Sequence, residues 1–130
     1  MVKRSDSLAL DTNVVIDILN GRQEIIDKYL PYTQIYLPFI VCGELLFGAH
    51  NSAKSKQNLK KFNSFIESCN ILNSNYLVTE QYAVTRKALK DKGKPIPEND
   101  IWIAATCIIH NVPLATFDKH FQHIPDLTLL

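Results

Sequence analysis

The 130-residue sequence has few of the residues that mark secreted or membrane proteins. Its three cysteines, Cys42, Cys69 and Cys107, form no CxxC pair, and their odd number does not suit a disulfide framework. No apolar run approaches the roughly 20 residues that a membrane helix needs. The start of the chain is polar and lacks the apolar stretch of a signal peptide. We therefore expect a cytoplasmic protein that does not associate with membranes.

The sequence also lacks an excess of charge of either sign. Lys and Arg number 14, Asp and Glu number 13, and the formal net charge is +1. This balance indicates neither a globally basic nucleic-acid binder nor an acidic tail. Hydrophobic residues make up 46% of the chain, which is typical of a folded protein, and the length suits a single domain over residues 1–130. The placement of the charges must therefore indicate the partner.

Short apolar segments alternate with segments of helical period along the chain. Apolar runs favour strands at 8–10, 35–37, 70–72 and 112–117, with a weak last strand at 128–130. Helices are expected at 11–19, 23–30, 41–47, 53–69, 76–92 and 100–110. Asn99 is expected to cap the last helix and Asn111 to end it in a left-handed conformation. The alternation predicts an α/β fold around a mostly parallel sheet of four to five short strands.

Four acidic residues lie in apolar contexts where a solvated side chain is not expected. Asp11 and Asp118 each follow a predicted strand. Glu44 lies within an apolar helix, and Asp100 precedes the most apolar helix of the chain. Because the carboxyl ends of parallel strands form the usual ligand crevice, Asp11 and Asp118 are expected at one edge of the sheet. Glu44 and Asp100 are expected to face the same edge.

Carboxylates that gather in a half-buried place need a compensating positive charge, because they repel one another and lose hydration. No Lys or Arg lies within five residues of Glu44. Mg²⁺ or Mn²⁺ suits carboxylate and water oxygens, whereas no His or Cys pair has the ligand spacing for Zn²⁺. Each acid alone can be explained as a helix cap, a first-turn acid or an exposed position. The four together predict a metal site.

The same residues carry a resemblance to the PIN-domain ribonucleases, most closely to the toxins of VapBC-type toxin–antitoxin pairs. Leu10-Asp-Thr-Asn-Val-Val-Ile16 resembles the first motif of that family, and Val41-Cys-Gly-Glu-Leu-Leu-Phe-Gly48 is similar to the second. Asn99-Asp-Ile-Trp-Ile-Ala-Ala105 resembles the third motif, and Leu114-Ala-Thr-Phe-Asp-Lys-His-Phe121 the fourth. The resemblance implies a PIN-like three-layer sandwich, a parallel sheet flanked by helices, with Mg²⁺ or possible Mn²⁺ at its edge.

The resemblance also implies roles for individual residues. Asp11 and Asp100 would be the main metal ligands, and the other two acids would complete the site directly or through water. Two polar residues match positions that orient the acids or the water molecules of the metal. The implied set consists of catalytic Asp11, Glu44, Asp100 and Asp118, with Asn13 and Thr116 as supporting residues.

The expected reaction is metal-dependent hydrolysis of an RNA phosphodiester, with Glu44 or Asp118 accepting the proton of the attacking water. This route does not use the ribose 2′-hydroxyl, so it predicts 5′-phosphate and 3′-hydroxyl ends. The resemblance further implies a toxin that inhibits translation and a homodimer, for which Phe47 and Phe62 are candidate contacts. It also implies a cognate antitoxin whose C-terminal segment lies across the active-site groove.

Two clusters of basic residues are candidates for guiding RNA toward the acids. One consists of Lys54, Lys56, Lys60 and Lys61, for which a solvated helix face is an equally good interpretation. The other leads toward Asp100 and consists of Arg86, Lys87, Lys90, Lys92 and Lys94. Phosphate contacts of this kind supply affinity and salt dependence but no sequence choice.

Two other functions stay open on the sequence alone. A phosphatase of the haloacid-dehalogenase type also has an Asp after its first strand, but Asn13 stands where its second Asp is expected. A non-catalytic PIN-like RNA-binding module would bind RNA without cleaving it. His120 and His123 suggest acid–base chemistry or a metal-binding pair, but with no third ligand near them we expect surface or packing roles. Trp102 is expected to pack in the core.

Overall fold

The computed structural model describes residues 6–130, and over this range it contains a four-stranded parallel sheet with the order β3-β2-β1-β4. The strands are β1 (Ser7–Leu10), β2 (Gln34–Pro38), β3 (Asn70–Leu72) and β4 (Leu114–Ala115). In the register of β1 with β4, Leu10 lies opposite Ala115. The expected last strand is an isolated bridge between Leu129 and Leu114.

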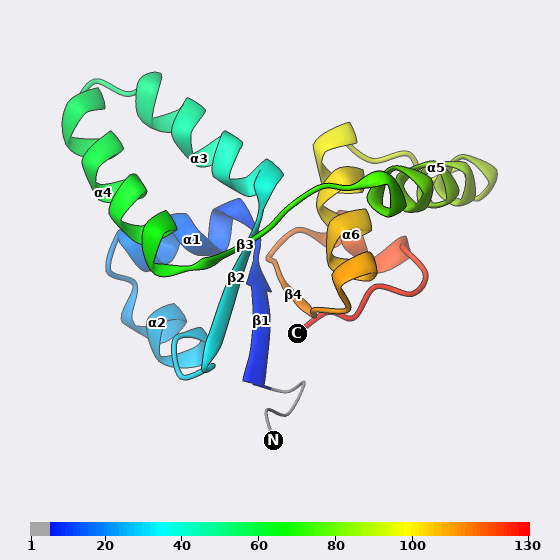
Figure 1. The fold of residues 1–130 in the computed structure, drawn as a ribbon, viewed down its shortest axis with the longest axis horizontal. Helices are drawn as coiled ribbons and strands as arrows, with labels where there is room; N and C mark the ends of the chain where they lie inside the picture. The colour runs from blue at the N-terminus through cyan, green and yellow to red at the C-terminus, as the bar shows by residue number, and fades with distance from the viewer. Residues whose placement is uncertain (1–5) are drawn as a thin grey trace.

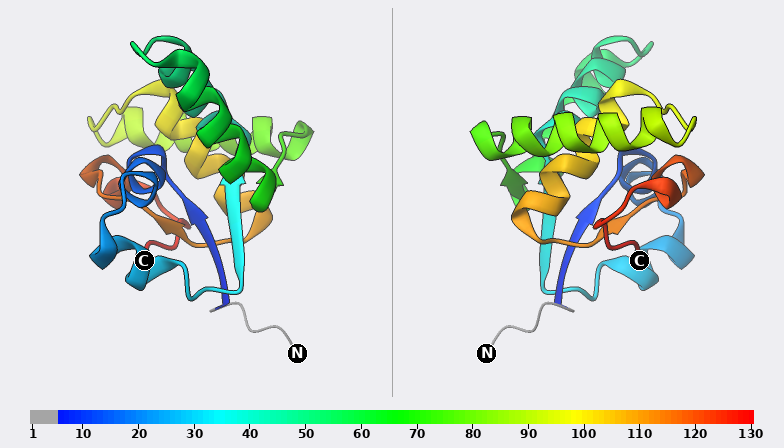
Figure 2. Two further views of the ribbon diagram at one scale, coloured as in Figure 1. Left: turned by 90° about the vertical axis from the view of Figure 1, so that its left-hand side faces the viewer. Right: turned by 90° about the vertical axis from the view of Figure 1, so that its right-hand side faces the viewer.

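Within residues 6–130, six α-helices and the short 3₁₀ helix η2 (Lys119–His123) flank the sheet. Figure 1 shows α1 to α4 on one side of the sheet and α5 and α6 on the other, which confirms the expected three-layer α/β fold. In the two views of Figure 2, α3 and α5 lie beyond the same end of the sheet. The helices are α1 (Thr12–Leu19), α2 (Gln23–Tyr29), α3 (Phe39–His50), α4 (Ser55–Ser68), α5 (Tyr76–Asp91) and α6 (Glu98–His110).

The central strand β1 passes directly into α1. Leu8, Ala9 and Leu10 have no exposed surface, as expected for an apolar run buried on both faces of a parallel sheet. The run ends at Asp11, whose carboxylate accepts a hydrogen bond from the backbone N–H of Thr12 and caps α1. The same residue therefore ends the strand and starts the helix, which places its side chain at the carboxyl edge of the sheet.

Two predicted boundaries were wrong. Asn99 does not cap α6, because the helix begins at Glu98 after Pro97 and Asn99 lies in its first turn. The strand predicted over 112–117 is confined to Leu114–Ala115. Asn111 has φ of 57°, which confirms the left-handed end of α6.

The buried side chains also fix the segment that follows β4. Phe121 in η2 has no exposed surface and belongs to the main hydrophobic core. Its burial anchors η2 beside the carboxyl ends of β1 and β4.

No helix in the described part of the chain is long and apolar enough to cross a membrane.

Candidate functional site

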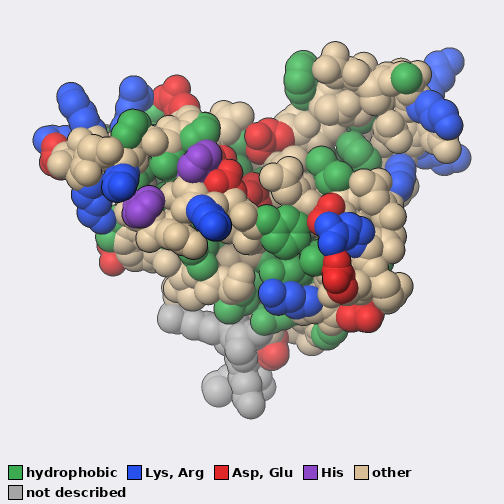
Figure 3. Space-filling view, turned by 180° about the vertical axis from the view of Figure 1, so that it is seen from behind, with side chains coloured by type: hydrophobic (Ala, Val, Ile, Leu, Met, Phe, Trp, Pro, Cys, Tyr) green, Lys and Arg blue, Asp and Glu red, His purple; other side chains and the backbone are tan. Residues whose placement is uncertain are grey.

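The four predicted acids line a single open cavity at the carboxyl edge of the sheet. The cavity has a volume of about 510 Å³. In Figure 3, acidic side chains gather in the hollow between the two raised parts of the molecule. Residues far apart in the sequence therefore meet at this edge: Asp11, Thr12, Asn13, Glu44, Pro97, Glu98, Asn99, Asp100 and Asp118.

Asp11 is the most deeply placed of these acids, with 6% of its surface exposed. Its Oδ1 accepts from the N–H of Thr12 at 2.8 Å, and its Oδ2 accepts from the hydroxyl of Thr116 at 2.7 Å. Burial raises the pKa of Asp11 above its usual range, the two hydrogen bonds oppose that rise, and the negative charge of Asp118 adds to it. The two hydrogen bonds thus hold both oxygens of Asp11 in fixed positions, and the burial of the charged carboxylate costs free energy.

Thr116, one of the two expected supporting residues, links two of the acids. Its hydroxyl donates to Asp11 and accepts from the backbone N–H of Asp118 at 3.0 Å. Asn13, the other expected supporting residue, lines the cavity, but its side chain forms no hydrogen bond with another residue in 6–130.

Thr12 is a site residue that the sequence reasoning missed. Its hydroxyl donates to Oε1 of Glu44 at 2.8 Å and so ties α3 to the start of α1. Asn13 was expected to orient the acids or the water molecules of the metal, and the hydroxyl that holds Glu44 is that of the neighbouring Thr12. The sequence feature that could have identified Thr12 is its position as a hydroxyl residue directly after Asp11, which ends the strand.

Asp100 lies in the first turn of α6 and has a 14% exposed side chain. Burial raises the pKa of Asp100, and the charges of Asp11 and Asp118 add to that rise. A hydrogen bond with His120 opposes it. Asp11 and Asp118 influence the pKa of Asp100 because the three carboxylates lie close together in the cavity.

His120 lies at the surface, as expected, and it also contacts two of the acids, which was not predicted. Its Nδ1 lies 3.2 Å from Oδ2 of Asp100 and 3.0 Å from Oδ1 of Asp118. In the sequence, His120 follows Asp118 by two residues. The 3₁₀ turn that brings its ring to the acids could not be predicted from the sequence.

The cavity has a strong deficit of positive charge. Among residues 6–130, no Lys or Arg forms an ion pair with any of the four acids. Carboxylate oxygens without a Lys or Arg partner are the donor set that a hard divalent cation prefers. The residues present therefore fit a bound divalent cation.

Part of the second basic cluster is already paired near the site. Arg86 forms an ion pair with Glu98 at 3.0 Å, and Lys87 forms one with Asp91 at 2.7 Å. Lys92 donates to the backbone carbonyl of His123 at 3.2 Å. Among the described residues, Lys90 and Lys94 are the two members of this cluster whose ammonium groups have no such partner.

The aromatic residues beside the site pack on one another. Trp102 is half-buried and stacks on Tyr82, with ring centroids 3.9 Å apart and ring planes 10° apart. The Arg86 guanidinium lies 5.9 Å from the centroid of the Tyr82 ring. The indole of Trp102 thus packs between helices α5 and α6 instead of in the main core.

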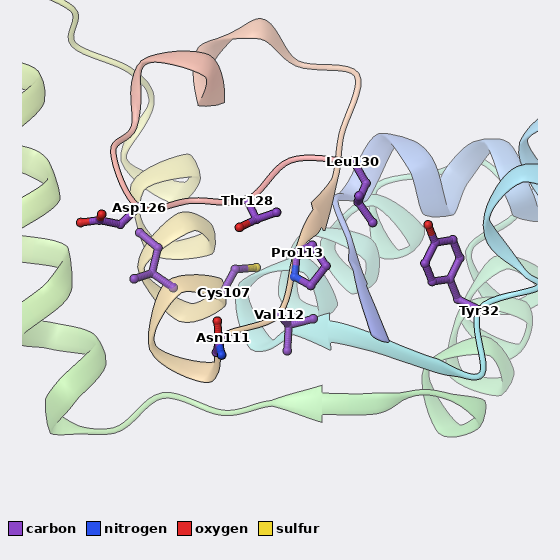
Figure 4. A pocket seen from close by; sticks show the side chains of 9 residues that line it. Tyr32, Cys107, Asn111, Val112, Pro113, Asp126, Thr128 and Leu130 are labelled. Atoms are coloured by element: carbon purple, nitrogen blue, oxygen red, sulfur yellow. The ribbon is translucent and has the colours of Figure 1, made fainter. Parts of the chain in front are cut away.

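A second cavity of about 260 Å³ lies away from the acids. Figure 4 shows its lining from the end of α6, the approach to β4, the C-terminal segment and Tyr32. Asp126 is the one acidic side chain among the described residues that line it, and Cys107 at its wall is buried. It lacks the converging acids of the first cavity, which is the candidate site.

Comparison with known proteins gives matches over most of the chain. Residues 8–127 match the PIN domain family. Ribonuclease VapC1 of Haemophilus influenzae (strain R2866) is 34% identical over 123 residues, covering 91% of this chain and 92% of the relative.

Two solved structures have the same fold over nearly the whole length. A chain of VapBC2 from Rickettsia felis, bound to a promoter DNA fragment, has a TM-score of 0.89 and 29% identity, with 95% of this chain and 97% of that chain covered. A chain of VapBC-1 from nontypeable Haemophilus influenzae has a TM-score of 0.87 and 31% identity, with 95% and 96% covered.

Proposed function

The chain belongs to the PIN domain family, and from this we propose that it is a Mg²⁺-dependent endoribonuclease that acts as the toxin of a toxin–antitoxin pair and inhibits translation. One observation carries the proposal: Asp11, Glu44, Asp100 and Asp118 line one open cavity without a Lys or Arg partner in residues 6–130. Similarity to a relative named as a ribonuclease supports it.

Asp11 and Asp100 are the residues that we assign as the main ligands of Mg²⁺, with Mn²⁺ as a possible replacement. Both are largely buried, and burial raises both of their pKa values, so a cation would relieve the largest electrostatic cost here. Glu44 and Asp118 would complete the site directly or through water. When bound, the cation supplies a Lewis acid that activates water and neutralises charge on the phosphate.

The protein side chains orient the acids and accept the proton. Thr116 and the N–H of Thr12 hold the two oxygens of Asp11, and the Thr12 hydroxyl holds Glu44. Whichever of Glu44 and Asp118 does not bind the cation accepts the proton of the attacking water as a general base. Water attacks phosphorus, the bond to the 3′-oxygen breaks with its electron pair staying on that oxygen, and the oxygen takes up a proton from solvent to become the 3′-hydroxyl.

The chemistry of the new RNA ends tests this proposal. Incubated with RNA and Mg²⁺, the protein is expected to leave 5′-phosphate and 3′-hydroxyl ends and to be inhibited by a chelator. The 5′ ends should be degraded by an exonuclease that requires a 5′-phosphate, without prior kinase treatment. A 2′,3′-cyclic phosphate product would contradict the proposed route, since that product forms by attack of the ribose 2′-hydroxyl.

We assign the guiding of RNA toward the acids to Lys90 and Lys94, the two residues of the second basic cluster that have no partner in the described structure. Replacing Lys90 and Lys94 by Gln is expected to weaken RNA binding and to lower the slope of log Kd against log salt by about 1.4, because each phosphate contact on a single strand contributes about 0.7. Binding would be measured by fluorescence anisotropy across a salt series.

Lys87→Gln is the matched control for this prediction, because the Lys87 ammonium is already paired with Asp91. Its slope is expected to stay near that of the wild type. A double Lys variant with an unchanged slope would exclude Lys90 and Lys94 from phosphate contact.

The groove next to the acids supports an antitoxin as partner. A shallow hollow of about 680 Å³ shares Thr12, Glu44 and Asn99 with the acidic cavity and continues to Phe47, which is 69% exposed. A partner segment with an apolar anchor on Phe47 and a basic side chain toward the acids would complement both parts. The similarity to chains of VapBC structures supports such a partner.

A homodimer is the final part of the proposal. Phe47 is exposed as expected for a contact residue, but Phe62 is half-buried against the core and is a poor candidate. Helix α5 offers a better surface, since Tyr76, Leu77 and Val84 are all more than half exposed. Apolar side chains that form one continuous exposed patch are typical of a protein interface.

A further inference from the structure

The imidazole of His120 lies at the mouth of the acidic cavity, in contact with two of its carboxylates. One ligand atom from each of His120, Asp100 and Asp118 can be chosen so that all three lie within 4.8 Å of one another. Figure 3 shows a histidine side chain beside the acidic side chains of the hollow. This spacing is compatible with one cation that contacts all three residues.

Local backbone structure places the imidazole there. Asp118 caps η2, and its Oδ1 accepts the backbone N–H of His120 at 2.9 Å. The next residue, Phe121, is fully buried and fixes the turn to the core. The backbone and the ring of His120 are therefore both held against Asp118, whereas His123 on the same short helix contacts none of the acids.

Exposure places the imidazole on the solvent side of the carboxylates. The His120 side chain is 48% exposed, compared with 30% for Asp118 and 14% for Asp100. A cation that enters from solvent meets the ring before it meets the deeper Asp11. A neutral imidazole presents one unprotonated nitrogen, which is a common metal ligand in proteins.

We propose that His120 gives the metal site a nitrogen ligand and so biases it toward Mn²⁺ over Mg²⁺. The inference rests on the proposed function, because it concerns the same cation. Mg²⁺ is a hard ion that prefers oxygen donors and retains its waters, whereas first-row transition metals accept imidazole more readily. A single histidine among carboxylates favours Mn²⁺ without creating a tetrahedral zinc site.

Pulsed electron paramagnetic resonance with Mn²⁺ alone as the probe tests this inference in the wild-type protein. The expected spectrum contains a ¹⁴N coupling from a directly bound imidazole. The coupling should vanish in His120→Gln and persist in His123→Gln, the control on the same helix. A wild-type spectrum with bound Mn²⁺ and no ¹⁴N coupling would overturn the inference.

Calorimetric affinities provide a second readout. His120→Gln is expected to bind Mn²⁺ about 10-fold or more weakly and to change little toward Mg²⁺, so the ratio of the two affinities falls. Tighter Mn²⁺ binding by His120→Gln would show that the imidazole competes with the cation and would overturn the inference.

The two proposals fail in different ways. If Mn²⁺ binds without a ¹⁴N coupling and RNA cleavage remains sensitive to chelator, the role of His120 is refuted and the ribonuclease proposal stands. If the wild-type protein binds neither Mg²⁺ nor Mn²⁺, both are refuted. Circular dichroism of the variants checks the fold, which the exposed position of His120 leaves intact.

Discussion

Asp11→Asn is expected to cleave RNA at least about 100-fold more slowly than the wild-type protein while keeping its fold, since removing one electrostatic stabiliser from an active site typically costs 10²–10³ in rate. Asp11 is the deepest acid of the cavity, and both of its oxygens are held by neighbours. The substitution removes its negative charge but keeps nearly the same shape. The cation therefore loses one carboxylate ligand, and the rate of cleavage falls, without a steric change in the site.

The fold survives this substitution for a local reason. Asn caps a helix about as well as Asp, so the start of α1 is retained. The amide keeps one oxygen acceptor for the N–H of Thr12 and loses one for the hydroxyl of Thr116, which costs about 1 kcal/mol. Loss of a buried charge offsets part of this cost.

Single-turnover cleavage of RNA in Mg²⁺ would measure the effect, with Asp27→Asn as the matched control. Asp27 is exposed on α2, outside the cavity, and accepts a hydrogen bond from Gln23. The control is expected to cleave at the wild-type rate and, when expressed in cells, to arrest growth as the wild type does. An Asp11→Asn protein that cleaves RNA as fast as the control would refute the assignment of the site.

The acids could be found in the sequence because each of them interrupts an apolar run. Asp11 and Asp118 follow strands, and parallel strands all end at one edge, so their convergence followed from the fold class. The sequence did not reveal that β4 lies directly beside β1. Because β4 lies beside β1, the Thr116 hydroxyl lies 2.7 Å from Oδ2 of Asp11. This hydrogen bond links the motif that contains Asp11 to the motif that contains Asp118.

The missed contacts depend on turns and side-chain partners that have no period in the sequence. His120 reaches Asp100 because a 3₁₀ turn starts at Asp118, and a 3₁₀ turn of five residues leaves no hydrophobic pattern. Arg86 looked like a free cation, but its partner Glu98 lies 12 residues away on the next helix. Long-range pairs of this kind become visible only when the helices are packed.

Divalent cations are expected to raise the free energy of unfolding of the wild-type protein by about 2.7 kcal/mol at 100 times Kd, the value for a ligand that binds only the folded state. A variant with both Asp11→Asn and Asp100→Asn should gain almost nothing, because it lacks the two main ligands. Urea unfolding followed by circular dichroism, in Mg²⁺ and in chelator, measures the difference. Equal stabilisation of both proteins would place the cation elsewhere.

Without cations, the order of stability is expected to reverse. The pKa values of Asp11 and Asp100 are raised above 3.8 in the folded protein, so between 3.8 and the raised values the folded state binds more protons than the unfolded state. The free energy of unfolding therefore falls as pH rises through that interval, and the loss is complete above the raised pKa values. The double variant lacks these titrations, so in chelator at pH 7 it should be at least as stable as the wild type and in Mg²⁺ less stable. A wild-type protein that is the more stable of the two in chelator would show that the acids are balanced within the fold and do not require a cation.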